Sequence, residues 1–317
     1  MMKRLFSALL LLILLAAPLP ACKKTAVTRV YTLNGTTGFG MAPLMTAGYE
    51  DYTFQVEKDA TAVRAALLAG DCDIAALPTN VAALLYNATE GALKVIALNT
   101  GSVLHLVTTG EAVGSLAALS GKTVYTPAQN PAFIFEAILA AAQITDITVD
   151  STTYATPEAL RTAVASGLVA FAVLPEPMVT IAQSAAAKQG VTVASLFNLG
   201  EVWNSYFPEN SLVQGCVVVR TAYLEKHPDR VQDFLEKYKT AIGAVKENPE
   251  AAAELIAAAG VFENKQVAAA AIPRCNLIYE DGVTMQAHLS AFLAAMPLSA
   301  IGGRLPDANF YYIRTDT

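Results

Sequence analysis

The chain has 317 residues, of which 54% are hydrophobic and only 15% are charged. This composition supports a large buried core in two lobes or domains and excludes a disordered chain. The formal net charge is −6 and no Lys/Arg cluster occurs, which argues against a nucleic-acid partner because phosphate binding requires a basic face.

Residues 1–21 have the pattern of a signal peptide. Lys3 and Arg4 supply a positive start, and the apolar run that follows is too short for a confident membrane span. The run ends Leu-Pro-Ala-Cys at Cys22, which resembles the lipobox of bacterial lipoproteins. We therefore expect lipidation at Cys22 and a short tether over residues 22–28. An ordinary secreted protein in which Cys22 is incidental is the alternative.

Residues 29–45 combine a β-branched strand-like run, a Gly/Thr loop and an apolar helix-like segment. Gly35, Gly38 and Gly40 permit a tight turn and a close backbone approach, and Thr36 and Thr37 add hydroxyls beside a helix N-terminus. This order of strand, loop and helix predicts a site for something small and polar. The alternative is that the glycines serve only the turn.

The next elements follow the hydrophobic pattern along the chain. A buried strand over residues 73–77 ends at a Pro-Thr-Asn turn, the place where open α/β sheets tend to bind ligands. In the first lobe we expect strands at 52–56, 73–77 and 95–98 and helices at 63–68 and 81–86. In the second lobe we expect strands at 123–125, 147–149, 170–174 and 191–196 and helices at 133–142, 157–166 and 178–188. A helix-rich segment follows from residue 221.

Two parts of the chain repeat one another. Val30-Tyr31-Thr32 recurs as Val124-Tyr125-Thr126, and residues 63–85 align without a gap on residues 160–182. Chance similarity of alanine-rich segments is the alternative, but the order of elements is also conserved. The repeat predicts an α/β fold with two similar lobes joined by two crossings. Lobe 1 is expected to comprise residues 29–103 and 217–317, and lobe 2 residues 104–216.

Three cysteines follow Cys22 in a chain expected to be exported, where disulfides are permitted. Cys216 and Cys275 both adjoin strand-like runs in the C-terminal half, so we expect them to pair and Cys72 to be free. The chain has no CxxC motif and its histidines are scattered, so no metal site is expected.

The lipobox-like ending, the two lobes, the segments DIAALPTN and LPEP and the ending IGGRLPDANFYY together resemble a solute-binding lipoprotein of an ABC importer. Within that class the chain resembles the type II periplasmic binding proteins that include nitrate, sulfonate and taurine binders and carriers of thiamine pyrimidine precursors (NMT1-like). The resemblance implies a monomer, lipid-anchored outside the cytoplasm, that binds a small-molecule solute between its lobes without a cofactor. Its partners would be an ABC permease and an ATPase.

The predicted ligand-binding residues are polar or aromatic and lie at the strand ends that should face the cleft. Thr79 and Asn80 could instead only cap a helix, Glu176 could cap a helix or pair with an arginine, and Trp203 could be core. Glu176 and Trp203 together favour a heterocycle similar to the thiamine pyrimidine over nitrate. The residues are Asn34, Thr36, Thr37, Gly38, Phe39, Gly40, Thr79, Asn80, Asn99, Thr100, Thr126, Gln129, Asn130, Glu176 and Trp203.

The sequence contains no arrangement for catalysis: it lacks GxGxxG, the P-loop and GxSxG. We therefore predict that the chain is not an enzyme. The alternatives are an enzyme on the same fold, similar to menaquinone-pathway lyases or to the pyrimidine synthase that uses a cleft histidine, and a surface sensor domain. His105 is expected to lie in the hinge or core.

Overall fold

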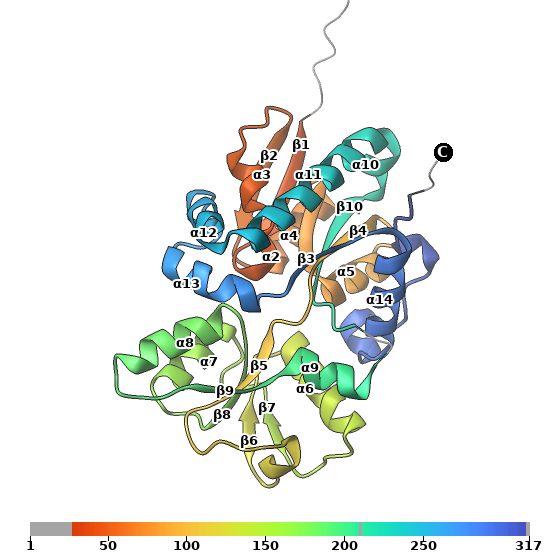
Figure 1. The fold of residues 1–317 in the computed structure, drawn as a ribbon. Coiled ribbons are helices and arrows are strands. Elements are labelled where there is room, and N and C mark those ends of the chain that lie inside the picture. Colours follow the sequence, from red (N-terminus) through yellow and green to blue (C-terminus); the bar gives the residue numbers. More distant parts are fainter. Residues whose placement is uncertain (1–26, 209–210, 315–317) are drawn as a thin grey trace, which may run out of the picture.

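Two separate β-sheets organise the chain (Figure 1). The computed structural model describes residues 27–208 and 211–314, so the expected signal peptide and Cys22 lie outside the described residues. The first sheet has the strand order β11-β4-β10-β3-β1-β2, and the second has the order β7-β6-β8-β5-β9. Each sheet is covered by helices, which confirms the predicted α/β fold with two lobes.

Lobe 1 is built from the first sheet and its helices. Its strands are β1 (Thr28–Leu33), β2 (Tyr52–Glu57), β3 (Ile74–Pro78), β4 (Leu93–Thr100), β10 (Gly215–Arg220) and β11 (Leu277–Glu280). Its helices are α2 (Thr36–Phe39), α3 (Ala42–Thr46), α4 (Ala60–Ala69), α5 (Thr79–Ala88), α10 (Thr221–Lys226), α11 (Pro228–Glu247), α12 (Pro249–Ala258), α13 (Lys265–Ala271) and α14 (Gly282–Ala294). Short 3-10 turns are η2 (Ile272–Arg274), η3 (Leu298–Ile301) and η4 (Ala308–Phe310).

Lobe 2 is built from the second sheet. Its strands are β5 (Leu104–Thr108), β6 (Thr123–Tyr125), β7 (Thr148–Asp150), β8 (Phe171–Pro175) and β9 (Ala194–Asn198). Its helices are η1 (Leu116–Leu119), α6 (Asn130–Ala141), α7 (Pro157–Ala165), α8 (Met178–Ala187) and α9 (Leu199–Tyr206).

The internal repeat is visible in the topology. In lobe 1, β2, β1 and β3 lie side by side and parallel, and β10 arrives from lobe 2 to pair antiparallel between β3 and β4. In lobe 2, β7, β6 and β8 have the same arrangement, and β5 arrives from lobe 1 to pair antiparallel between β8 and β9. Each lobe therefore completes its sheet with a strand that follows a crossing.

The two crossings lie against each other. The Gln214 amide donates to the Thr100 carbonyl at 2.9 Å, and the Val103 amide donates to Gln214 Oε1, also at 2.9 Å. The second crossing ends slightly earlier than the sequence suggested, because Gly215 and Cys216 already pair with β3 and β4 of lobe 1.

Local signals set the helix boundaries. The Asp59 side chain caps α4 by accepting hydrogen bonds from the amides of Thr61 and Ala62, and Gly70 ends the helix in the left-handed conformation with φ +80°. In the repeat, Thr156 caps α7 and accepts from the Ala159 amide. Helix α4 is followed directly by β3, and α7 by β8, so these signals help to set where the two strands begin.

The largest hydrophobic cluster extends through both lobes. It contains Leu77 of β3 and Phe292 of α14 from lobe 1 together with Phe135 of α6 and Trp203 of α9 from lobe 2. The opposite face of the lobe 1 sheet has its own cluster under α11 and α12, and lobe 2 has a third under α7 and α8. Apolar burial therefore joins the lobes on one side of the crossings.

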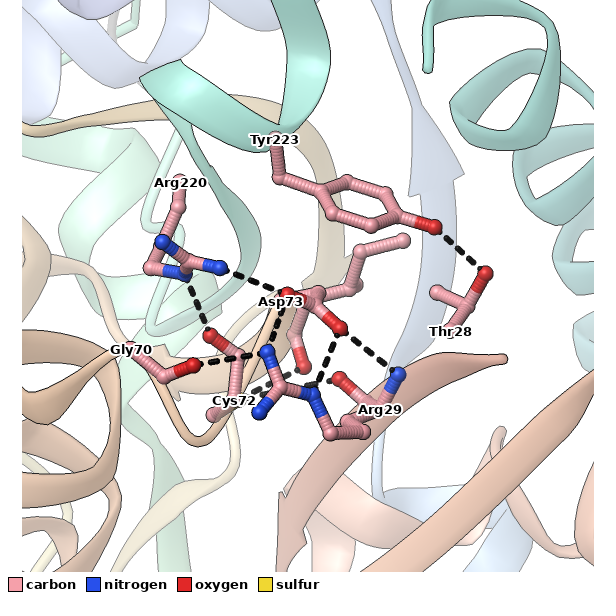
Figure 2. Close-up of polar contacts among 8 residues, drawn as sticks. Thr28, Arg29, Gly70, Cys72, Asp73, Arg220 and Tyr223 are labelled. Carbon is pink, nitrogen blue, oxygen red and sulfur yellow. Dashed lines mark hydrogen bonds and ion pairs between the residues drawn. The ribbon is translucent and has the colours of Figure 1, made fainter. Parts of the chain in front are cut away.

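An ionic network around the buried Asp73 lies at the end of lobe 1 that points away from lobe 2 (Figure 1 and Figure 2). Asp73 is 2% exposed. Its carboxylate accepts from Arg29 Nε at 2.9 Å and from Arg220 Nη2 at 2.7 Å. Thr28, expected to end the tether, is instead the first residue of β1 and is buried, with its hydroxyl 2.6 Å from that of Tyr223. The network joins the starts of β1 and β3 to the end of β10.

Candidate functional site

The predicted site residues lie where strands end and helices begin, at the facing ends of the two lobes. In lobe 1 these places follow β1, β3 and β4, and in lobe 2 they follow β6 and β8. The two rims touch where the Thr36 hydroxyl donates a hydrogen bond of 2.8 Å to the carbonyl of Glu176. The ends of β1 and β8 therefore face each other across the boundary between the lobes.

Glu176 has a fully buried side chain and several protein partners. Its Oε1 accepts from Arg274 Nε at 2.6 Å, and its Oε2 accepts from the Thr180 amide and hydroxyl at 3.2 and 2.7 Å. The sequence left two alternatives open for Glu176, a helix cap and an arginine pair, and both are present in the structure. The carboxylate therefore needs no cation from a ligand.

Several lobe 1 rim residues are engaged by the protein itself. Asn99 donates through Nδ2 to the Thr37 carbonyl at 3.3 Å and to the Tyr238 hydroxyl at 3.1 Å. Thr100 donates to Asn99 Oδ1 at 3.0 Å, and Thr79 donates to the Val213 carbonyl at 2.8 Å. These contacts fix the rim and attach it to the second crossing.

Other rim atoms are buried and have no hydrogen-bond partner in the described part of the chain. They are Thr32 Oγ1 and Asn80 Oδ1 in lobe 1 and Thr126 Oγ1 and Asn130 Oδ1 in lobe 2. Thr32 and Thr126 occupy equivalent positions of the repeat, and Asn80 and Asn130 lie in the first turns of α5 and α6. Because an unpaired buried polar atom is costly, their positions at strand and helix ends suit an exogenous polar partner.

The remaining predicted polar residues are placed at the edge of the site. Asn34 and Gln129 are exposed, and Gln129 precedes α6 with a φ of +68°. Thr37 is half-buried, with its carbonyl bound by Asn99.

The glycine loop is explained by packing. A Cβ on Gly38 would lie 2.1 Å from the Leu33 carbonyl oxygen and 2.8 Å from Val261, and one on Gly40 would lie 2.7 Å from Ile242. Phe39 between them is fully buried, with its ring 6.0 Å from that of Phe262. These three residues therefore pack α2 against β1 and α11. This close packing explains the two glycines without a bound ligand.

We expect Gly38→Ala to lower the free energy of unfolding by about 2 kcal/mol, because the added methyl would meet backbone atoms that cannot move aside. Urea unfolding would measure the effect. Gly243→Ala is the matched control, since Gly243 is exposed on α11 with nothing within 4 Å of the new Cβ. The control should be neutral or stabilising by about 0.5–1 kcal/mol. Equal effects of the two changes would contradict the packing explanation.

Trp203 is part of the core. It is 0% exposed, and its ring centroid lies 4.3 Å from that of Phe207 and 5.7 Å from that of Phe292. The indole therefore has no open face for a ligand, and the packing alternative replaces the stacking prediction. Helix α9 carries Trp203 from lobe 2 toward α14 of lobe 1.

A cavity of about 240 Å³ lies at the crossings and is lined from both lobes. Its walls include Ser102 of the first crossing, Val213 of the second, Asn198 at the end of β9, Glu201 of α9, and Asn276 before β11. The Ser102 hydroxyl is buried there with no partner in the described chain. None of the residues predicted from sequence lines this cavity.

The predicted disulfide between Cys216 and Cys275 is wrong, because both cysteines are free and buried. They lie in different hydrophobic clusters: Cys216 belongs to the one that also contains Leu77 and Trp203, and Cys275 belongs to the one under α11 and α12. Alternation along β10 sends Cys216 to one face of the sheet and its neighbour Val217 to the other, so Cys216 cannot reach Cys275.

We expect none of Cys72, Cys216 and Cys275 to react with a thiol reagent while the chain is folded, measured on a Cys22→Ser variant. Burial raises the pKa of Cys72 and of Cys275 to about 12 and raises that of Cys216 as well, so little thiolate forms. All three should react after unfolding, with or without a reductant. Rapid labelling of the native chain, or a requirement for reductant, would contradict this.

His105 belongs to lobe 2 but lies near the rim, where the charges of Glu176 and Arg274 act on it. It lies in β5, is 7% exposed, and its Nδ1 is 3.3 Å from the Ser195 hydroxyl of β9. Burial lowers its pKa. Within residues 27–208 and 211–314, no group of three or more His, Cys, Asp or Glu side chains could hold a metal ion, and no helix is long and apolar enough to cross a bilayer.

Sequence reasoning missed Thr32, Thr180 and Arg274. Thr32 could have been found, because it is the repeat partner of Thr126, which was predicted. Thr180 and Arg274 carried no signal, since Arg274 lies 98 positions from Glu176 and meets it only through the fold.

The two sheets, the crossings that exchange β5 and β10, and the facing polar rims define a type II periplasmic binding fold. The sequence model of the family described as NMT1/THI5 like matches residues 51–252, and the chain belongs to this family. No curated protein shows a significant match to the sequence.

Solved structures share the fold at low identity. An ABC transporter protein from Parabacteroides distasonis superposes with a TM-score of 0.76 at 20% identity, over 92% of this chain and all 100% of that one. The periplasmic aliphatic sulphonate binding protein SsuA from Escherichia coli gives 0.69 at 16%, over 92% and 93%. The alkanesulfonate-binding protein SsuA from Xanthomonas axonopodis pv. citri, bound to MOPS, gives 0.62 at 15%, over 89% and 95%.

Proposed function

We propose that the chain is the extracytoplasmic solute-binding component of an ABC importer. It captures a small polar organic solute between its lobes by hinge closure and delivers it to the permease. The family, the fold and the binding proteins that share it support this role. The observation that carries the proposal is the set of buried, unpartnered polar atoms on both rims: Asn80 and Thr32 on one side, Asn130 and Thr126 on the other.

The rims favour a neutral solute that offers N–H or O–H donors. Two of the unpartnered atoms are amide oxygens, which accept hydrogen bonds, and the carboxylate of Glu176 is already neutralised by Arg274. A nitrate or sulphonate would require a positive partner to offset its desolvation. The N-termini of α5 and α6 offer an anion only about 0.3–1 kcal/mol each.

A thermal-shift screen tests the proposal on the chain without residues 1–21 and with Cys22→Ser. The panel contains aminopyrimidines and other vitamin precursors, amino acids, alkanesulphonates and nitrate. A ligand at 100 times its Kd should add about 2.7 kcal/mol to the free energy of unfolding. Asn130→Leu should abolish the shift, whereas the exposed control Gln189→Leu, just after α8, should not. No shift with any class of solute would overturn the proposal.

Localisation and anchoring belong to the same proposal. We place the protein outside the cytoplasm, held to the membrane by a lipid on Cys22, as a monomer. Strand β1 begins at the end of lobe 1 remote from lobe 2, so an anchor at the N-terminus would leave the hinge free to close (Figure 1). Replacing Cys22 with serine should release the protein from membranes, and retention of the variant would contradict the lipid anchor.

The enzyme alternative gains no support from the site. The histidine-donor type would require an accessible histidine on the facing rims, whereas His105 is 7% exposed and its Nδ1 lies 3.3 Å from the Ser195 hydroxyl of its own lobe. We therefore propose a binding function without catalysis or a cofactor.

A further inference from the structure

We propose that Arg274 is a positioning residue for closure: its ion pair with Glu176 bridges the two lobes, stabilises the closed arrangement and thereby sets how long a solute stays bound. The inference deepens the proposed function by assigning a regulator of the same cleft, and it rests on that function for its biological meaning. The ion pair itself can be tested without any solute.

The pair connects parts of the chain that belong to different lobes. Arg274 ends η2, between α13 and β11 of lobe 1, whereas Glu176 follows β8 of lobe 2. Arg274 Nε lies 2.6 Å from Glu176 Oε1, and Arg274 Nη2 also donates to the Thr180 hydroxyl. Rotation of one lobe away from the other must break both contacts.

Glu176 contacts the first crossing, lobe 1 and helix α8 of its own lobe. Its amide donates to the Val103 carbonyl of the first crossing at 2.9 Å, and its carbonyl accepts from Thr36 of lobe 1. Its carboxylate caps α8 through Thr180 and binds Arg274. The backbone of Glu176 therefore contacts both the first crossing and Thr36 of lobe 1, and its side chain contacts both α8 and Arg274 of lobe 1.

Neighbouring contacts strengthen the same link. The Thr36 hydroxyl, which binds the Glu176 carbonyl, also lies 3.5 Å from the sulfur of Cys275, the residue after Arg274. Helices α13 and α8 contact each other beside the pair. The arginine, the threonine and the cysteine thus form one lobe 1 surface that fits around Glu176.

Because Glu176 is buried, loss of Arg274 should disfavour the closed arrangement more than the open one. The side chain of Glu176 is 0% exposed and that of Arg274 is 43% exposed. A carboxylate that lost its cation while still buried would be strongly disfavoured, so removing the arginine destabilises the closed arrangement more than an open one in which water reaches Glu176. Because the arginine is partly exposed, salt should weaken the pair.

The effect on solute follows from the lobe equilibrium. A solute bound by both rims leaves through the open arrangement, so a less stable closed arrangement shortens its residence time. The association rate, which depends on the open arrangement, should change little. We expect Arg274→Gln to raise the dissociation rate about tenfold, which corresponds to the loss of about 1.4 kcal/mol.

The experiment measures the distance between spin labels on the two lobes in the solute-free chain with Cys22→Ser. The labels are attached at Leu68→Cys and Leu168→Cys, because Leu68 and Leu168 are 59% and 73% exposed and the native cysteines are buried. Arg274→Gln should add a population with a changed interlobe distance, and Arg274→Lys should restore part of the original population. In the unsubstituted chain 1 M NaCl should reproduce the shift, and in Arg274→Gln it should add nothing.

Arg161→Gln is the charge-matched control, because Arg161 lies on α7 within lobe 2 and donates to Thr162 beside it. The control should leave the distance distribution unchanged. Identical distributions for Arg274→Gln and the parent, with both folded by circular dichroism, would overturn the inference. A failed solute screen would overturn the importer role and leave this result standing, so the two failures are distinguishable.

Discussion

Replacing Trp203 with alanine is expected to lower the free energy of unfolding by about 3–5 kcal/mol. Its side chain is fully buried between Phe207 and Phe292, so the change opens a cavity where α9 of lobe 2 meets α14 of lobe 1. Urea or thermal unfolding, followed by circular dichroism, would measure the loss. Trp203→Phe should cost less because it retains part of the buried ring area.

Tyr206→Ala provides the control for this change, because Tyr206 lies on the same helix and is 42% exposed. It should alter stability by no more than about 0.5 kcal/mol. If Trp203→Ala left stability intact but abolished solute binding, the packing role would be wrong and ligand stacking would return as the explanation.

Replacing Asp73 with asparagine is expected to lower the free energy of unfolding by about 3 kcal/mol, because it leaves two arginines facing a neutral group in a mostly buried place (Figure 2). The arginine side chains of 29 and 220 are 39% and 24% exposed, which keeps the expected loss at the lower end of the range for buried pairs. Asp71→Asn is the control, since Asp71 is exposed two positions away.

The same carboxylate predicts a dependence of stability on pH. Burial by itself would raise the pKa of Asp73, but the hydrogen bonds from Arg29 and Arg220 outweigh it, and the pKa lies below its ordinary value of 3.8. A lowered pKa in the folded chain gives stability that is present above pH 3.8 and is lost as the pH falls below it. The stability difference between the parent and Asp73→Asn should therefore shrink between pH 5 and pH 2. A constant difference would contradict this assignment.

Much of the fold was predictable because it depends on local pattern. Buried strands such as 74–78 read as continuous apolar runs, and Asp59 and Gly70 bound α4 through capping and a positive φ that follow from residue type alone. The repeat of residues 63–85 at 160–182 then implied two similar lobes. The order of strands within each sheet was not predictable in this way, because β5 and β10 pair with strands that lie far away along the chain.

The candidate site was only partly predictable. Polar residues after parallel strands, such as Asn80 and Thr126, were identified because all such strand ends meet at one edge of a sheet. The roles of Gly38 and Trp203 were misjudged, because their neighbours Leu33, Val261 and Phe292 come from packing that no local pattern encodes.

The sequence by itself determined the α/β class, the two similar lobes and the placement of polar residues at strand ends, because hydrophobic period, turn residues and capping act over a few positions. Only the tertiary structure decided which side chains meet: Arg274 pairs with Glu176, and two arginines pair with Asp73. It also placed Cys216 and Cys275 in separate hydrophobic clusters. Those outcomes depend on which side chains the packed lobes bring within a few ångströms and deprive of water. Separation along the chain carries no information about that.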